Sequence, residues 1–316
     1  MTLIDENFLG IFLAFVAACS WGFAAILYRI VLKEKKNSIL FSITIRGIFA
    51  VPFIALATLF FSNFQSSEFL FSPGIFPILV ISAICVGLGD LGFFIALQRL
   101  EVSIAQPIAS IYPLFTSILT IGLGYEVLTS EIFLGTAILI LGVGLISQQT
   151  RKIEDVTLSN PRSITIGIIS AILGAIAWSF GILTLTILLD YPAVNSLSLA
   201  TVRFTILTII VGIIWICSLI YQKYILKIKI INIRDQIQPQ KVFILGIGGI
   251  ISWGIGGVSF FTAIELIDSG RATPISSINP LIAVLLGVIL LKEKLNKTQI
   301  EGIILVTLGS ILIGVS

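Results

Sequence analysis

The sequence repeats itself once along most of its length. Trp21 and the small residues around it return at Trp178, a shift of 157 residues, and Arg46 returns as Arg203 at the same shift. The later parts of the two copies match at a constant shift of 167 residues, so one loop of the second copy is longer. A unit of this length is not a solenoid repeat, and it indicates two copies of one domain.

Composition places both copies in a membrane. Hydrophobic residues make up 57% of the chain, charged residues 11%, and the mean hydropathy is +1.12, values far from those of soluble globular domains. At roughly 20 apolar residues for each helix that crosses a bilayer, the sequence predicts ten spans. They run approximately over 8–32, 38–61, 74–98, 102–123, 130–148, 163–189, 195–219, 242–266, 271–291 and 297–316.

Five spans in each half bring the second copy into the membrane from the opposite side. We therefore expect an all-α integral membrane protein whose ten helices form two inverted five-helix repeats, residues 8–148 and 163–316. The N-terminal apolar run is long enough to span a bilayer, and acidic residues precede it, so we interpret it as the first membrane helix.

Basic residues separate the two membrane faces. The face without the termini holds Arg29, Lys33, Lys35, Lys36, Arg99, Arg151, Lys152, Arg162, Lys223, Lys227, Lys229, Arg234, Lys241, Lys292, Lys294 and Lys297. The opposite face holds Arg271 alone, and Arg46 and Arg203 lie inside spans. Because positive loops stay in the cytoplasm, the charge bias predicts that both termini lie outside.

The histidine, cysteine and charge content of the chain disfavours catalytic, metal-binding and nucleic-acid-binding functions. The chain has no histidine, which removes the most common general base and metal ligand. Cys19, Cys85 and Cys217 lie inside apolar runs and indicate neither a disulfide framework nor a metal cluster. A net charge of +3 gives no reason to expect a nucleic-acid partner. We expect no catalytic residue, no metal and no cofactor.

The repeated residues resemble those of EamA transporters of the drug/metabolite transporter superfamily. Each half begins with a helix of small residues and tryptophan, followed by an arginine in the second helix: Ala18, Trp21, Gly22 and Arg46, then Ala175, Trp178 and Arg203. Each half ends on one pattern, which reads Ala105, Pro107, Pro113, Glu126, Gly135 and Gly142, then Ala272, Pro274, Pro280, Glu293, Gly302 and Gly309.

The resemblance covers essentially the whole chain and implies a ten-helix bundle that moves a small organic molecule by alternating access without ATP hydrolysis. It implies that the first, third and fourth helices of each half line a central cavity and that the fifth is peripheral. The termini of several such proteins face the cytoplasm, and the charge bias of this sequence departs from that pattern.

Asp90 and the two arginines are charged groups inside predicted spans. Because such groups are costly in lipid, Asp90 is a functional candidate that could hold a coupling proton or pair with a substrate amine. The alternative is an ion pair with Arg46 or Arg203. The symmetric arginines favour a structural role, with direct contact to an anionic substrate as the alternative, and Glu126 and Glu293 favour a structural role as anchors between the fourth and fifth helices.

The candidates for a polar cavity come from six spans. Prolines interrupt the helical hydrogen-bond ladder at Pro107, Pro113, Pro274 and Pro280. The expected lining residues are Trp21, Asp90, Ser110, Tyr112, Trp178, Trp253, Ser277 and Asn279. Tryptophans in mid-span would offer ring faces to a ligand, or else pack within the bundle.

The function expected is secondary transport of a small metabolite, an amino acid or related compound, in the direction of export across the cytoplasmic membrane. Its partners would be the small-molecule substrate, membrane lipid and coupling protons, with the protein a monomer or a homodimer. An integral-membrane enzyme and a passive channel are the alternatives. The sequence leaves open the substrate, the direction, the coupling ion, the oligomeric state and the membrane orientation.

Overall fold

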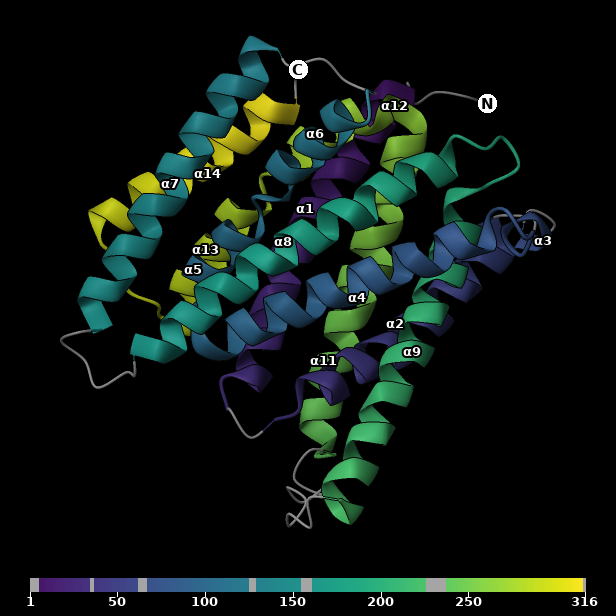
Figure 1. The fold of residues 1–316 in the computed structure, drawn as a ribbon, viewed down its shortest axis with the longest axis horizontal. Coiled ribbons are helices and arrows are strands. Elements are labelled where there is room, and N and C mark those ends of the chain that lie inside the picture. The colour runs from purple at the N-terminus through teal and green to yellow at the C-terminus, as the bar shows by residue number, and fades with distance from the viewer. Residues whose placement is uncertain are drawn as a thin grey trace.

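The computed structural model of the protein describes residues 6–34, 37–61, 67–124, 129–154, 161–225 and 237–314. In these ranges every regular element is a helix (Figure 1). Seven of the described helical segments are long and apolar enough to cross a membrane, and Ser130–Ile146 and Asn279–Leu291 are shorter apolar helices. The protein is therefore an all-helical, multi-pass membrane protein, while the sequence predicted ten spans.

The first half consists of α1 (Glu6–Leu32), α2 (Ile39–Phe61), α3 (Ser67–Leu70), α4 (Phe76–Arg99), α5 (Val102–Ala109), α6 (Tyr112–Gly122) and α7 (Ser130–Glu154). The second half consists of α8 (Pro161–Leu189), α9 (Ser196–Tyr224), α11 (Pro239–Gly249), the π-helix η2 (Ile250–Gly257), α12 (Val258–Ser276), α13 (Asn279–Leu291) and α14 (Lys297–Gly314). α1 begins and α14 ends on the same side of the bundle (Figure 1).

Each half contains one helix break at a matching position. α5 ends at Ala109 and α6 begins at Tyr112, while α12 ends at Ser276 and α13 begins at Asn279. A proline occupies the first turn after each break. Proline lacks the amide hydrogen and its ring clashes with the carbonyl four residues earlier, so the preceding helix cannot continue through it.

Two features of the second half differ from the sequence prediction. α12 continues through 267–270, where a loop between the eighth and ninth spans was expected. Asp268, Ser269 and Gly270 have low helix propensities, but each costs at most about 1 kcal/mol there, which tertiary packing can override. The preceding turns also widen into the π-helix η2 within a glycine-rich stretch, and π-helical turns occur frequently at functional sites.

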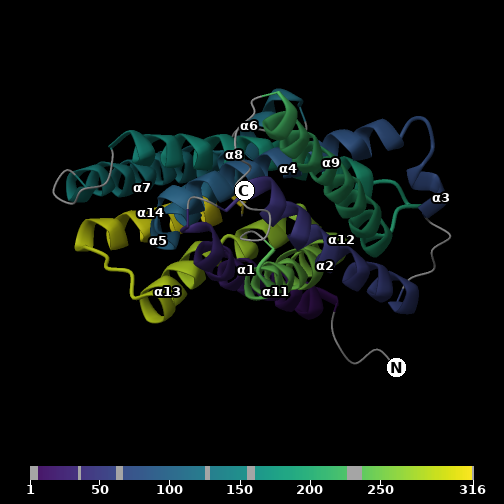
Figure 2. The same ribbon diagram turned by 90° about the horizontal axis from the view of Figure 1, so that it is seen from below.

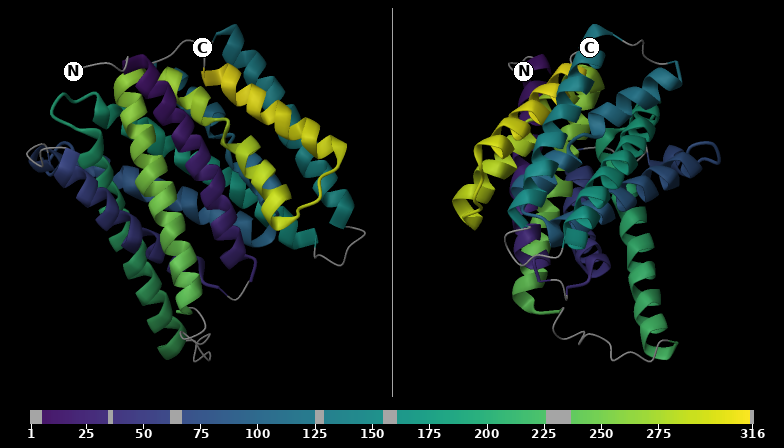
Figure 3. Two further views of the ribbon diagram at one scale, coloured as in Figure 1. Left: turned by 180° about the vertical axis from the view of Figure 1, so that it is seen from behind. Right: turned by 60° about the vertical axis from the view of Figure 1, so that its left-hand side comes forward.

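Glycines hold the last helices of the two halves together. A Cβ atom at Gly135 would lie 2.8 Å from the Gly309 carbonyl oxygen, and one at Gly142 would lie 2.7 Å from the Gly302 carbonyl oxygen. Partner numbers fall as residue numbers rise, so α7 and α14 run antiparallel with their backbones in contact. The pair forms one edge of the molecule (Figures 1 and 3).

The remaining helices pack across the two halves rather than within them. α1 of the first half packs on η2, α12 and α13, and α8 of the second half packs on α4 and α6. α2 packs on α9. Figure 2 shows the layer of α4, α8 and α9 facing the layer of α1, α2 and α11. The polar residues that the sequence predicted in mid-span lie between these layers.

Candidate functional site

A cavity of about 140 Å³ lies between the two halves. Residues of all the long helices except α7, α11 and α14 line it, namely Trp21, Ala24, Ala25, Tyr28, Arg46, Val86, Asp90, Phe93, Gln106, Ser110, Tyr112, Trp178, Ile182, Leu185, Arg203, Phe204, Ser252, Trp253, Gly257, Phe260, Phe261 and Asn279. Cavities of about 150 Å³ hold a molecule the size of benzene. The space therefore suits a small solute.

Seven of the eight residues expected to line a cavity do so in the structure, namely Trp21, Asp90, Ser110, Tyr112, Trp178, Trp253 and Asn279. Ser277 is the exception. Its hydroxyl donates a hydrogen bond of 2.8 Å to the carbonyl oxygen of Thr273. The hydroxyl therefore bonds to the backbone of the preceding helical turn. Serine side chains often form such a bond, and the sequence alone does not show which serines do so.

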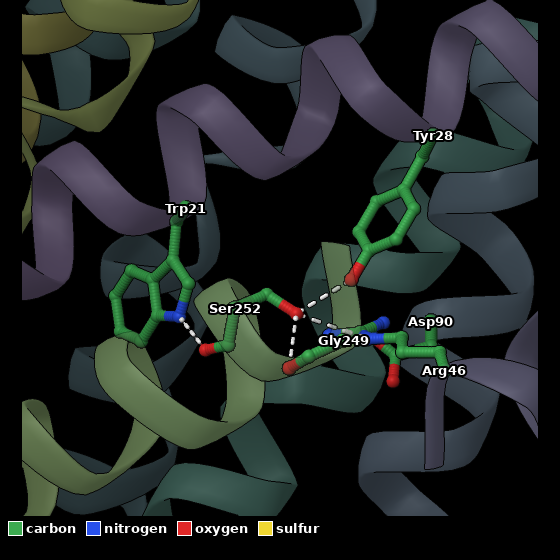
Figure 4. Close-up of polar contacts among 6 residues, drawn as sticks. All are labelled: Trp21, Tyr28, Arg46, Asp90, Gly249 and Ser252. Carbon is green, nitrogen blue, oxygen red and sulfur yellow. Dashed lines mark hydrogen bonds and ion pairs between the residues drawn. The ribbon is translucent and has the colours of Figure 1, made fainter. Parts of the chain in front are cut away.

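Asp90 forms an ion pair with Arg46 in the cavity wall. Arg46 Nη1 lies 3.1 Å from Asp90 Oδ1, and both side chains are almost fully buried. Arg46 Nε also donates a hydrogen bond of 3.2 Å to Ser252 Oγ (Figure 4). The pair joins α2 to α4 and, through Ser252, to the second half. Each charge is thus compensated in a place where lipid could not solvate it.

Aromatic rings surround the Arg46 guanidinium. Its central carbon lies 4.2 Å from the ring centroid of Trp253, 5.1 Å from that of Tyr28 and 5.6 Å from that of Phe94. The negative faces of such rings attract a cation at these distances. Arg46 is consequently held by a carboxylate, a hydroxyl and three rings, which fixes its position in the wall.

Ser252, in the π-helix η2, joins α1 to this cluster. Its carbonyl oxygen accepts a hydrogen bond of 3.0 Å from Trp21 Nε1, and its hydroxyl lies 2.6 Å from the Tyr28 hydroxyl (Figure 4). The sequence prediction missed both Ser252 and Tyr28. Tyr28 follows Trp21 by seven residues, two helical turns along the same face, so helical spacing could have identified it.

Arg203 occupies the matching position in the second half with fewer partners. Its Nη2 donates a hydrogen bond of 2.7 Å to the carbonyl oxygen of Gly181, and its central carbon lies 5.5 Å from the ring centroid of Phe261. Arg203 Nε is buried without a hydrogen-bond partner. The two arginines therefore share a position in the repeat, but the guanidinium of Arg203 has fewer hydrogen-bond and ion-pair partners than that of Arg46.

The two helix breaks meet at the cavity. Asn279 Oδ1 accepts hydrogen bonds of 2.8 Å from Gln106 Nε2 and 2.9 Å from Ser110 Oγ. The hydroxyl of Ser179 donates a hydrogen bond of 2.8 Å to the carbonyl oxygen of Tyr112. Side chains of the opposite half thus satisfy polar groups at the first break, as membrane interiors require.

Glu293 links the two halves at the start of α5. Its carboxylate accepts hydrogen bonds of 2.9 Å from the Val102 amide and 3.0 Å from the Ser103 amide, at the start of α5. The side chain is 9% exposed. The sequence predicted an anchor between the fourth and fifth helices of its own half; the carboxylate instead caps a helix of the other half, whose unpaired amides attract it. Glu126 lies outside the described residues.

The wall can bind an organic solute through rings and through isolated polar groups. Polar atoms of four lining residues are buried without a hydrogen-bond partner: Asp90 Oδ2, Gln106 Oε1, Tyr112 Oη and Arg203 Nε. Such atoms cost free energy unless a ligand or water satisfies them. Among the described residues, no cluster of three or more acidic residues or cysteines could hold a metal.

The chain is similar in sequence to archaeal proteins. It is 28% identical over 314 residues to an uncharacterized transporter of Archaeoglobus fulgidus, over 96% of this chain and 98% of that one. It is 36% identical over 107 residues to an uncharacterized protein of Methanocaldococcus jannaschii, over 34% of this chain and 72% of that one.

The fold is also similar to one already solved by crystallography. The TM-score is 0.56 at 15% sequence identity, over 96% of this chain and 95% of the other. The model of the EamA-like transporter family matches this chain twice, at residues 8–148 and 165–315. With both matches, nearly the entire chain is accounted for, and the protein belongs to the EamA-like transporter family, so it is a membrane transporter.

Proposed function

We propose that the protein is a secondary transporter that moves a small organic metabolite across the cytoplasmic membrane by alternating access. The observation that supports this most strongly is the cavity itself: it lies inside a membrane bundle, both halves line it, and broken helices of both halves meet there. Transporters built from two repeats bind their substrate at such an interface.

The proposal includes ten membrane helices in two inverted repeats. Its support is the reciprocity of the contacts between the halves. The indole of Trp21 lies against Gly256, and that of Trp178 lies against Gly89, which are the same two positions exchanged between the copies. Equivalent exchange relates the glycines of α7 and α14. A rotation of about 180° around an axis in the membrane plane would produce this pattern.

For the transported solute we propose an amino acid or related metabolite, with export as the direction and protons as the coupling ion. A cavity of about 140 Å³ suits a molecule of that size. Ring faces can hold its carbon skeleton, while unpartnered polar atoms can bind its polar groups. The ion pair of Asp90 and Arg46 offers a carboxylate that can accept a proton when the pair separates.

Filling the cavity should stop transport. Ala25 is 1% exposed and lines the cavity, so the Ala25→Phe side chain would occupy the space of the substrate. We expect metabolite counterflow in proteoliposomes to fall to the level of empty vesicles. The control is Ala137→Phe, an exposed position on α7, which should leave counterflow unchanged.

The same assay separates the proposed carrier from other classes. A carrier saturates and shows counterflow, a channel does neither, and an enzyme alters the solute chemically. Normal counterflow in the Ala25→Phe protein would show that solute takes another route. Linear flux without counterflow in the wild type would favour a channel.

The charge bias predicts that the face with the α9–α11 connection lies in the cytoplasm. The structure adds one contact at that face, a salt bridge of 2.9 Å between Lys241 Nζ and Glu34 Oε2. We expect a fluorescent protein fused to Ser316 to stay dark in a bacterial host, since the termini would be outside. A bright fusion that folds in the cytoplasm would show the reverse orientation.

A further inference from the structure

The second arginine of the repeat lies in the cavity wall without the carboxylate that accompanies the first. Arg46 pairs with Asp90, whereas the residue that matches Asp90 in the second copy is Gly257. In the part of the chain that the structure describes, Arg203 forms no ion pair. It donates a hydrogen bond to the Gly181 carbonyl oxygen and lies beside the ring of Phe261, and the Asp90 carboxylate attracts it from beyond ion-pair distance.

The surroundings of the two arginines are otherwise closely similar. The guanidinium of Arg46 lies 5.6 Å from the ring centroid of Phe94, and that of Arg203 lies 5.5 Å from that of Phe261. Asp90 precedes Phe94 by one helical turn, and Gly257 precedes Phe261 by the same distance in sequence. Gly257 lines the cavity. The place of the second carboxylate is thus occupied by a residue without a side chain, and a Cβ atom at this point of the cavity wall would lie 3.3 Å from the ring of Phe204.

The charges of the cavity wall do not balance. Its charged residues are Arg46, Asp90 and Arg203, two cations and one anion, so the wall has a net charge of +1. Arg203 is 3% exposed, and its Nε has no hydrogen-bond partner. A buried cation is costly unless an anion or water reaches it, and here the cavity is the route by which one can.

We propose that Arg203 binds a carboxylate of the transported substrate. The proposal rests on the transport function proposed above and names the substrate class, a small organic molecule with one carboxylate. Guanidinium and carboxylate bind through charge-assisted, often bidentate hydrogen bonds. One carboxylate compensates the single charge of Arg203, whereas a phosphate dianion would overcompensate it. Asp90 Oδ2 and Gln106 Oε1 remain as acceptors for an amino group of the same molecule.

Tryptophan fluorescence of the purified protein can test this binding. Three of the four tryptophans, Trp21, Trp178 and Trp253, line the cavity. The probes are amino acids and straight-chain monocarboxylic acids, each beside the amide in which a neutral amide replaces the carboxylate, together with inorganic phosphate. We expect at least one acid to change the fluorescence saturably, with an affinity about tenfold or more above that of its amide.

Variants then assign the effect to the arginine. Arg203→Gln should weaken binding of that acid about tenfold or more and leave the amide unaffected, while Arg203→Lys should retain part of the preference. Lys223→Gln removes the same charge from an exposed position of the same helix, α9, and should change nothing. If Arg203→Gln does not fold, Arg203→Lys and the acid–amide comparison in the wild type decide the question.

The proposal is overturned if no acid binds, if acids and amides bind equally well, or if Arg203→Gln binds the acid with unchanged affinity. Tighter binding of phosphate would also refute a carboxylate site. Counterflow in proteoliposomes distinguishes failure of the carboxylate site at Arg203 from failure of the proposed transport function. Saturable counterflow of a solute without a carboxylate refutes the site alone, whereas carboxylate binding through Arg203 without counterflow refutes transport alone.

Discussion

Replacing Asp90 with asparagine should abolish proton-driven transport in proteoliposomes while substrate exchange continues. The amide has nearly the shape of the carboxylate but cannot take up or release a proton. Asp90 is 2% exposed and pairs with Arg46 in the cavity wall, and no other carboxylate lies among the residues that line the cavity. We expect flux driven by a pH gradient to fall about a hundredfold or more, to the level of empty vesicles.

Two control variants distinguish a loss of proton coupling from a loss of folding. Asp90→Asn leaves the charge of Arg46 unpaired, which can destabilise a buried site by about 3–5 kcal/mol. The double variant Asp90→Asn with Arg46→Gln removes both charges and should restore folding, but not proton coupling. Asp190→Asn changes an exposed acid beyond the end of α8 and should transport normally. If the Asp90→Asn protein shows unaltered pH-driven flux, Asp90 has a structural role and does not carry the coupling proton.

Two glycines of α7 should respond in opposite directions to alanine. A Cβ atom at Gly142 would lie 2.7 Å from the Gly302 carbonyl oxygen and 2.8 Å from the Val306 amide nitrogen. Both are backbone atoms of α14, so the helices would have to separate. Overpacking of this kind costs about 1–3 kcal/mol. We expect a clear fall in the melting temperature of the purified Gly142→Ala protein.

Gly144 provides the matched control two residues away in the same helix. Nothing lies within 4 Å of a Cβ atom built there. Gly144→Ala should therefore raise the stability by about 0.5–1 kcal/mol, since alanine favours a helix more than glycine does. Equal melting temperatures for the two variants would mean that α7 and α14 do not meet through their glycines. The α7–α14 contact would then not stabilise the protein.

Much of the fold followed from local patterns. Apolar runs predicted the helices, because lipid leaves no alternative for the backbone amides. Prolines at matching positions predicted the interruptions near Ser110 and Ser277, since a proline ring blocks the preceding turn wherever it occurs. The π-helix η2 could not be predicted, because glycine-rich stretches are compatible with several helical forms.

The candidate site could be predicted by residue type but not by pairing. Mid-span polar and aromatic residues were selected because lipid cannot satisfy them, and seven of the eight lie in the cavity wall. Ser252, Tyr28 and Gln106 were missed, since serine, tyrosine and glutamine within apolar helices often bond to neighbouring backbone or pack without a ligand. Their partners lie more than a hundred residues away in the sequence.

The sequence by itself determined the class of the protein, its duplication and its family, because each depends on composition or on a comparison of residues along the chain. Only the tertiary structure decided which charges meet. Asp90 pairs with Arg46 and not with Arg203, and Glu293 binds the α5 helix of the other half. Such choices depend on distances between helices, and the pattern of apolar residues along one helix does not specify the neighbour against which it packs.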